Sequence, residues 1–510
     1  MIAATRLLAL VWVATCLSQQ TADAQTAPIV RVGEQSQVGV KEENGVASFR
    51  GIAYARSPVG ILRWKAPLPP LPRRSKADAT RFGPACPQSE GNTRWYRNVA
   101  RAMGADPAVV PGIERMSEDC LYLNVWTPDV KPQKPLAVMV WIHGGSNENG
   151  YSHEPNYLSS RLAKQGLVVV SINYRLGLLG FFAHPALGSD ASGRQGLLDQ
   201  VAALKWIRRN IAHYGGDPSR VTLFGESAGG TDIATLATLP QTKGLFARAI
   251  IQSGYLQSPV GNARGAVTSL ADAEMMAGGL FAERATATSL RSMPWQEIVA
   301  LQGQKLSGHF YAPVADWPRS LSIPILIGSN ADEYLMYLPK DEAGQQAELD
   351  ADLSGLSDER VARIRSMLAL MPGTLANRAD AVGAGKAFHC PSARLADATA
   401  AQGMPVFAYH FERVRGGSHG LGAYHGTEIP YAFDTHDTWL PTDAEDRKLT
   451  RITQDYWLNF ARTGNPNGQG LPQWPQWRGA APQLLGLGDS IAAKPMPRAA
   501  LCELLSPPER

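Results

Sequence analysis

The sequence predicts an α/β fold in which helices flank a doubly wound, mostly parallel sheet, and three observations support this. Continuous apolar runs at 136–143 and 167–173 are typical of strands buried on both faces of a parallel sheet. A long helical pattern at 195–214 follows them, so strand and helix alternate. The next strand leads into a serine flanked by glycines. Because these elements continue along the chain, we expect residues 25–510 to form one domain.

The first residues indicate export. Arg6 precedes an apolar run from Leu7 to Leu17, and Ala22-Asp-Ala24 places small residues where a signal peptidase cuts. The run is too short for a membrane anchor. We therefore expect residues 1–24 to be a signal peptide and the mature protein to be periplasmic or secreted.

The composition indicates a globular protein and excludes several classes of partner. The chain has 510 residues, with 49 Lys and Arg against 45 Asp and Glu, and its basic residues form no long block. After the first residues, no stretch is long and apolar enough to span a membrane, and no Cys and His show zinc spacing. We expect no nucleic-acid partner, membrane span, metal or cofactor, and the sequence does not indicate the oligomeric state.

The remaining elements follow in order along the chain. Residues 25–135 alternate short strand-like pieces with proline-rich irregular ones, and the helix at 195–214 should end at Gly215-Gly216. Further strands are expected at 247–252, 323–328 and 405–410. The stretches 255–320 and 335–400 show helical patterns. We expect these to be insertions over the strand ends, where such folds build their pockets.

Ser227 lies on the turn around which the chain is organised. An apolar run from Val221 to Phe224 precedes Gly225-Glu-Ser-Ala-Gly229, and a helical pattern follows. A serine on a sharp turn from strand to helix needs small neighbours, because a Cβ there would collide with nearby backbone. The alternative is a glycine-rich turn that has only a packing role. A second Gly-x-Ser-x-Gly match at Ser418 has no helical pattern behind it and indicates a loop, so the context favours Ser227 as a nucleophile.

A serine hydrolase also needs a histidine that accepts the hydroxyl proton and an acid that orients this histidine, in the chain order serine, acid, histidine. Asp332 and Glu333 follow the strand expected at 323–328, and His425 lies in a glycine-flanked loop after a later strand, with His419 close by. Each of these could instead be an ordinary loop residue. The residues alone leave both acids and both histidines open.

Six ordered motifs extend the pattern over most of the mature chain, at Phe49–Tyr54, Glu118–Trp126, Trp141–Gly145, Asn173–Gly177, Gly215–Pro218 and Phe224–Gly230. In these motifs the chain resembles the type-B carboxylesterases, which include cholinesterases and Candida-type lipases and have the α/β-hydrolase fold. The resemblance implies Ser227 as nucleophile, Glu333 as the acid and His425 as the general base.

The resemblance also implies an oxyanion hole made by the backbone N–H groups of Gly145, Ser146 and Ala228. Many members of the family have Gly or Ala and then an aromatic residue where this chain has Ser146-Asn147. We therefore expect a more polar wall against the acyl group of the substrate.

Two further roles and two disulfides follow from the same resemblance. Glu226 is similar to the family's buried glutamate beside the active site, and Ser253 to a hydroxyl near the triad. After the first 24 residues an even number of cysteines remains, which makes two disulfides plausible in an exported protein. The resemblance pairs Cys86 with Cys120 and makes Cys390 with Cys502 a reasonable second bridge.

We therefore expect a serine hydrolase that cleaves a small-molecule carboxylic ester through an acyl-enzyme, without a cofactor. Two alternatives are an amidase or carbamate hydrolase with the same triad, and a non-catalytic binding module of the same fold.

A further hypothesis concerns the substrate. Polar residues replace the usual aromatic residue after the oxyanion glycine, and an aromatic lining typical of a quaternary-ammonium site is not expected. Arginine engages both oxygens of a carboxylate, which suggests esters with carboxylates on the acyl part, such as polycarboxylate esters of some microbial toxins. The alternative is that these arginines are solvated surface residues. The residues behind this hypothesis are Asn147, Glu148, Asn149, His153, Arg413, Arg415 and His419.

Overall fold

The structure is a computed structural model that describes residues 27–72, 76–188, 193–254, 270–281, 285–305, 320–418, 420–479 and 481–505. The expected signal peptide, residues 1–24, lies outside the described residues.

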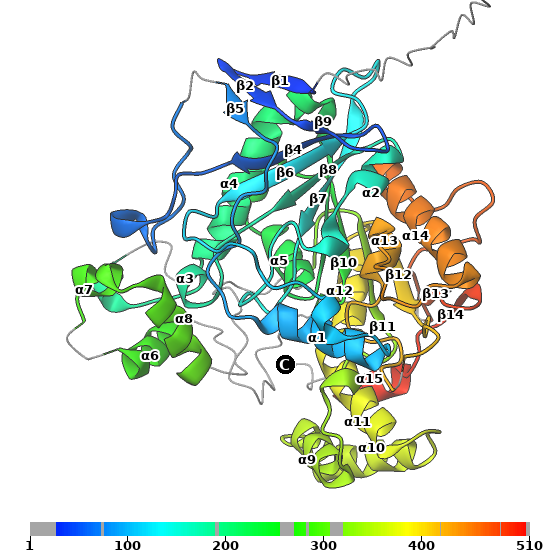
Figure 1. Cartoon of the computed structure of the whole chain (residues 1–510). Coiled ribbons are helices and arrows are strands. Elements are labelled where there is room, and N and C mark those ends of the chain that lie inside the picture. The colour runs from blue at the N-terminus through cyan, green and yellow to red at the C-terminus, as the bar shows by residue number, and fades with distance from the viewer. Residues whose placement is uncertain are drawn as a thin grey trace, which may run out of the picture.

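A large sheet forms the centre of the molecule (Figure 1). Its strands are β3 (Val40–Lys41), β4 (Ala47–Ala53), β6 (Tyr122–Thr127), β7 (Leu136–Ile142), β8 (Val168–Ile172), β9 (Gly216–Glu226), β10 (Arg248–Gln252), β11 (Ile325–Asn330), β12 (Val406–Phe411), β13 (Gln483–Leu487) and β14 (Ile491–Pro495). They lie in the order β14-β13-β12-β11-β10-β9-β7-β8-β6-β4-β3. All neighbouring pairs from β13 to β8 are parallel, and the outer pairs are antiparallel. The predicted mostly parallel sheet is therefore confirmed.

A smaller sheet contains β1 (Ile29–Val32), β2 (Gln35–Val38) and β5 (Ala77–Asp78). The helices are α1 (Gly91–Ala102), α2 (Ser160–Lys164), α3 (Gly177–Gly180), α4 (Gln195–Asn210), α5 (Ala228–Leu236), α6 (Leu270–Leu280), α7 (Ala287–Ser292), α8 (Trp295–Lys305), α9 (Glu342–Leu353), α10 (Asp358–Ala369), α11 (Leu375–Ala384), α12 (Cys390–Ala401), α13 (Ile429–Phe433), α14 (Ala444–Thr463) and α15 (Ala499–Leu505).

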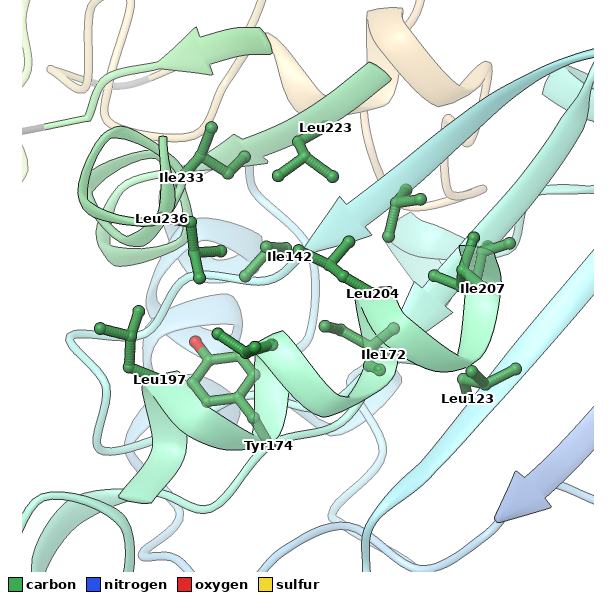
Figure 2. Close-up of a cluster of buried hydrophobic side chains, with 14 of the residues drawn as sticks. Leu123, Ile142, Ile172, Tyr174, Leu197, Leu204, Ile207, Leu223, Ile233 and Leu236 are labelled. Atoms are coloured by element: carbon green, nitrogen blue, oxygen red, sulfur yellow. The ribbon is translucent and has the colours of Figure 1, made fainter. Parts of the chain in front are cut away.

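Helices cover both faces of the large sheet, and the side chains of β7 show how. Because successive side chains of a strand point to opposite faces, Val138, Val140 and Ile142 join one buried cluster and Met139 and Trp141 join another. The first cluster packs the strands against α4 and α5, as Figure 2 shows. The second packs them against α13 and α14. Burial on both faces explains the continuous apolar runs of the strand sequences.

The central strands and helix lie close to the positions that the sequence predicts. The strands expected at 136–143, 167–173, 247–252, 323–328 and 405–410 are β7, β8, β10, β11 and β12, shifted by one or two residues. The helix expected at 195–214 is α4 followed by a short 3₁₀ turn, and Gly215 ends it with φ +83°.

The described parts of the expected insertions are mainly helical. Helices α6 to α8 and α9 to α12 come from them, and Figure 1 places α9, α10 and α11 together at one end of the molecule. Helix α1 was not expected, because residues 25–135 read as strand-like and irregular pieces.

Both expected disulfides are confirmed. Cys86 is bonded to Cys120 with a Cα–Cα distance of 5.0 Å, and Cys390 to Cys502 with 5.2 Å.

A search of the described helices finds none that is long and apolar enough to cross a bilayer. Among all residues that the structure describes, His, Cys, Asp and Glu form no group of three that could hold a metal ion.

Candidate active site

Ser227 lies at a sharp turn between β9 and α5. Its backbone has φ +56° and ψ −125°, a conformation that a residue with a side chain rarely adopts. A Cβ on Gly225 or Gly229 would lie 2.6 Å or 2.1 Å from the carbonyl oxygen of Ile142 on β7, so both positions need glycine. The Ser227 amide donates to the carbonyl of Gln252, 2.9 Å away. The turn therefore has the geometry of the expected elbow, with Ser227 on the wall of a cavity.

Glu333 lies directly against His425. Its Oε2 accepts a hydrogen bond from Nδ1 of His425 over 2.6 Å. Its Oε1 accepts two more, from the Ser253 hydroxyl (2.6 Å) and the Asn330 amide (2.7 Å). Glu333 is fully buried. These donors fix the carboxylate, and because Nδ1 donates to it, Nε2 of His425 is the nitrogen that can accept a proton.

Asp332, the other candidate acid, has a different contact. Its Oδ2 accepts from the amide of Ala423 over 2.8 Å, and its own amide donates to the Ala423 carbonyl. Asp332 thus holds the loop that carries His425 without touching the imidazole. His419 lies outside the described residues. Ser418 follows a turn and does not line the cavity.

Glu226 contacts the other side of the imidazole, with Oε1 3.2 Å from Nε2 of His425. Burial by itself would lower the pKa of His425, but the charges of Glu226 and Glu333 outweigh it and raise this pKa to about 9. Burial also raises the pKa of Glu226, to about 8, although His425 opposes this. The imidazole thus lies between two buried carboxylates that favour its protonated form.

A cavity of about 310 Å³ joins these residues. Ser227, His425 and Glu226 lie on its wall beside Gly145, Ser146 and Ala228. Within the described ranges, the backbone N–H groups of Gly145, Ser146 and Ala228 donate no hydrogen bond. The structure therefore brings the expected oxyanion donors to the same wall as the serine.

The lining is more aromatic than the sequence predicts. Trp95 and Tyr96 of α1 line it, and so do four residues from other segments, namely Tyr157, Tyr334, Tyr337 and Phe388. The expectation of a wall made polar by Asn147 is wrong. Asn147 is buried, and its Nδ2 donates to Asp232 of α5 rather than pointing into the cavity. Asn149 does line the cavity, where its Oδ1 accepts from the Ser89 hydroxyl.

The arginines expected to face the substrate have other partners. Arg413 forms ion pairs with three aspartates, namely Asp443, Asp446 and Asp489. Arg415 lies over the ring of Tyr431, 4.4 Å from its centroid, and donates to the Pro441 carbonyl. Neither lines the cavity. The expectation that these two arginines face the substrate is therefore wrong.

Glu148 and His153, two of the polar residues of that hypothesis, do not line the cavity either. His153 stacks on Phe82, with ring centroids 4.7 Å apart. Burial raises the pKa of Glu148 to about 8, and Glu148 is also absent from the cavity wall.

The aromatic residues that the sequence analysis missed come from separate segments. Trp95 and Tyr96 lie on the unexpected helix α1, and Phe388 lies in a π-helical turn, Gly385–His389, before α12. Only Tyr334 had a usable signal, since it directly follows Glu333.

A model described as the Carboxylesterase family matches residues 32–504. The chain is 34% identical to the para-nitrobenzyl esterase of Bacillus subtilis (strain 168) over 490 residues, covering 91% of this chain and 96% of that protein. It is also 34% identical to the fumonisin B1 esterase of Sphingopyxis macrogoltabida over 467 residues, covering 85% and 82%.

Two further matches extend these results. The phenmedipham hydrolase of Pseudarthrobacter oxydans is 34% identical over 486 residues, which are 88% of this chain and 93% of that protein. A solved PNB esterase superposes with a TM-score of 0.79 at 31% identity, covering 94% of this chain and all of that one. These matches confirm the resemblance seen in the motifs and the enzyme class, and they remove the alternative of a non-catalytic module. The chain belongs to the carboxylesterase family and is a carboxylic ester hydrolase with the α/β-hydrolase fold.

Proposed function

We propose that this enzyme hydrolyses small, uncharged esters with aromatic or apolar groups, through an acyl-enzyme formed on Ser227. The aromatic cavity carries this proposal. No Lys or Arg is found among its described lining residues to pair with a carboxylate of the substrate. Aromatic side chains bind flat apolar groups through a large contact area.

In the proposed mechanism, Nε2 of His425 takes the hydroxyl proton of Ser227 while Oγ attacks the ester carbonyl carbon. The carbonyl oxygen becomes an oxyanion, to which Gly145, Ser146 and Ala228 donate their N–H groups. Each such donor is worth about 10²- to 10³-fold in kcat. His425 then protonates the leaving alcohol, and a water molecule releases the acid by the same steps. Glu333 keeps the imidazole in the required tautomer and stabilises its charged form.

The carboxylate-bearing ester remains the second substrate class to test. The ion pairs of Arg413 and the buried position of Arg415 argue against it. Fumonisin B1 itself is a substrate to test, because a fumonisin B1 esterase is among the relatives. Carbamates form a third class, because a phenmedipham hydrolase is among the relatives.

The test is a matched panel: an aryl ester with a neutral acyl group, the same ester with a carboxylate on the acyl side, the corresponding carbamate and the corresponding anilide. We expect the neutral ester to have the highest kcat/KM. Ser227→Ala should abolish turnover of the neutral ester, and an organophosphate should no longer label the enzyme. Higher efficiency with the charged ester, lost at high salt, would contradict the proposed substrate class. Labelling at Ser418 would contradict the choice of nucleophile.

We also propose that the enzyme works in the periplasm or outside the cell. The two disulfides support this, because such bonds persist mainly in oxidising compartments. Amino-terminal sequencing of the protein from a culture of its source would test it. We expect the first residue to be Gln25, and recovery of an intact Met1 in the cytoplasmic fraction would contradict the proposal.

A further inference from the structure

The loop that follows β7 has an unfavourable backbone conformation. Gly145, Ser146 and Asn147 have φ values of +100°, +59° and +58°. Glycine adopts such values freely and Asn tolerates them better than most residues, whereas Ser146 has a clear cost, so this conformation raises the free energy of the loop. This loop carries two of the three proposed oxyanion donors. Contacts from its surroundings must therefore hold it in place.

Asn147 supplies two of these contacts. Its carbonyl oxygen accepts from the amide of Gly177 at the start of α3, over 2.7 Å. Its Nδ2 donates to Oδ1 of Asp232 over 3.1 Å. Asn147 is 1% exposed and Asp232 is fully buried. Because neither side chain meets solvent, the bond between them is not exchanged for bonds to water.

Asp232 lies on α5, the helix that begins with the third proposed oxyanion donor, Ala228. Its other carboxylate oxygen accepts from Nε2 of Gln200 on α4. The carboxylate is thus held from α4 and in turn holds Asn147. This chain of bonds joins the loop that carries Gly145 and Ser146 to the helix that carries Ala228.

We propose that Asn147 and Asp232 are positioning residues, whose hydrogen bond fixes the amides of Gly145 and Ser146 relative to that of Ala228. The inference rests on the proposed function of these amides as the oxyanion hole. Such donors must lie within a few tenths of an ångström of the productive geometry, and a displacement of about 1 Å can cost about 100-fold in rate. The bond contributes to the transition state rather than to binding of the ground state.

The first variant is Asn147→Leu, which keeps the approximate shape of the side chain and removes the donor. We expect kcat to fall about 10- to 100-fold, which does not exceed the decrease in kcat when one oxyanion donor is removed. KM should change by less than about threefold. An aryl trifluoromethyl ketone forms an oxyanion when Ser227 adds to it. Its inhibition constant should rise by the same factor as kcat falls.

Asp232→Asn is the conservative variant, and it should keep the activity of the wild type. An amide at position 232 can still accept from Asn147. Its NH₂ group can donate to Oε1 of Gln200, which has no partner among the described residues, once the Gln200 amide turns over. We expect kcat and ketone affinity within about threefold of the wild type, since both bonds persist.

Thr235→Val is the matched control on the same helix. Thr235 is buried, and its hydroxyl donates to the carbonyl of Thr231 within α5, over 3.1 Å, without touching the loop. We expect this variant to lower the melting temperature and leave kcat unchanged. Should Asn147→Leu fail to fold, the double variant Asn147→Leu/Asp232→Leu removes both partners together and avoids a buried unpaired carboxylate. Its kcat should fall by the same 10- to 100-fold.

The outcomes separate this inference from the proposed function. If wild-type ester turnover is absent or persists in Ser227→Ala, the proposed function itself fails. If turnover depends on Ser227 but Asn147→Leu, or the double variant, lowers only the melting temperature, the bond is merely structural and the inference is overturned. A kcat of Asp232→Asn that falls by more than about threefold, at a normal melting temperature, would also overturn the inference.

Discussion

At the scale of single residues, the hydrogen bond between Glu333 and His425 favours Glu333 over Asp332 as the acid. Glu333→Gln would place an amide against Nδ1 of His425 and favour the wrong tautomer. We expect kcat to fall by about 10³- to 10⁴-fold, as for the equivalent change in other triads. Asp332→Asn keeps an oxygen that can accept from Ala423, so we expect less than about a tenfold loss. Steady-state kinetics on one aryl ester compares them, and a larger loss in Asp332→Asn would exclude Glu333 as the acid.

The charge of Glu226 sets a second expectation at this scale. The base must be neutral to accept a proton, and the pKa of His425 is raised to about 9. The wild-type kcat/KM should therefore rise with pH, with a midpoint above the ordinary histidine value of about 6.5. Glu226→Gln removes the strongest raising charge and should move this midpoint down by about one pH unit or more.

Glu428→Gln provides the control for this pH shift. Glu428 is a buried carboxylate that raises the pKa of His425 least among the three glutamates. The midpoint should move less in this variant than in Glu226→Gln. An unchanged midpoint in Glu226→Gln would show that Glu226 does not control protonation of the base.

At the scale of elements, the disulfide between Cys390 and Cys502 ties α15 to the start of α12. Leu501 and Leu504 of α15 pack into a cluster with residues of α9, α10 and α11. The bond closes a long loop, with a sequence separation of 112 residues. Replacing both cysteines by serine should lower the free energy of unfolding by about 2–5 kcal/mol. Urea denaturation of the oxidised wild type and the double variant measures the difference, and equal midpoints would contradict it.

Elements also show what the sequence could predict. Strands β7 to β12 were found because burial on both faces leaves continuous apolar runs, and the elbow because backbone contacts demand glycine at 225 and 229. Helix α1 was missed because only three of its residues, Thr93, Val99 and Ala100, are buried. A helix with so few fully buried residues depends on its tertiary contacts, which a local pattern does not reveal.

The partners of the arginines show the same limit for the site. Arg413 precedes its partners Asp443, Asp446 and Asp489 by tens of residues. Nothing near Arg413 in the chain distinguishes a substrate-binding cation from one that holds a helix in place. The order of Ser227, Glu333 and His425 was predictable because it follows the order of the strands, whereas the shape of the cavity depends on segments that fold over them.

At the scale of the whole molecule, the sheet separates two cores and gathers the site at one edge. Ser227 follows β9, Glu333 follows β11 and His425 lies in the loop after β12. Strands β9 to β12 are consecutive and parallel in the sheet, so their carboxyl ends meet at the same edge. The proposed catalytic residues therefore lie at this edge of the sheet. Helices that cross the edge form part of the cavity wall.

The disulfide between Cys86 and Cys120 encloses all of α1, and with it Trp95 and Tyr96 of the cavity wall. This part of the wall is therefore a covalently closed loop, and the disulfide keeps the Cα atoms at its two ends close together, 5.0 Å apart in this chain. A protein engineer who wants a different alcohol or acyl preference can exchange the loop as a cassette from a relative. The serine, the histidine and their acid all lie outside the segment that is exchanged.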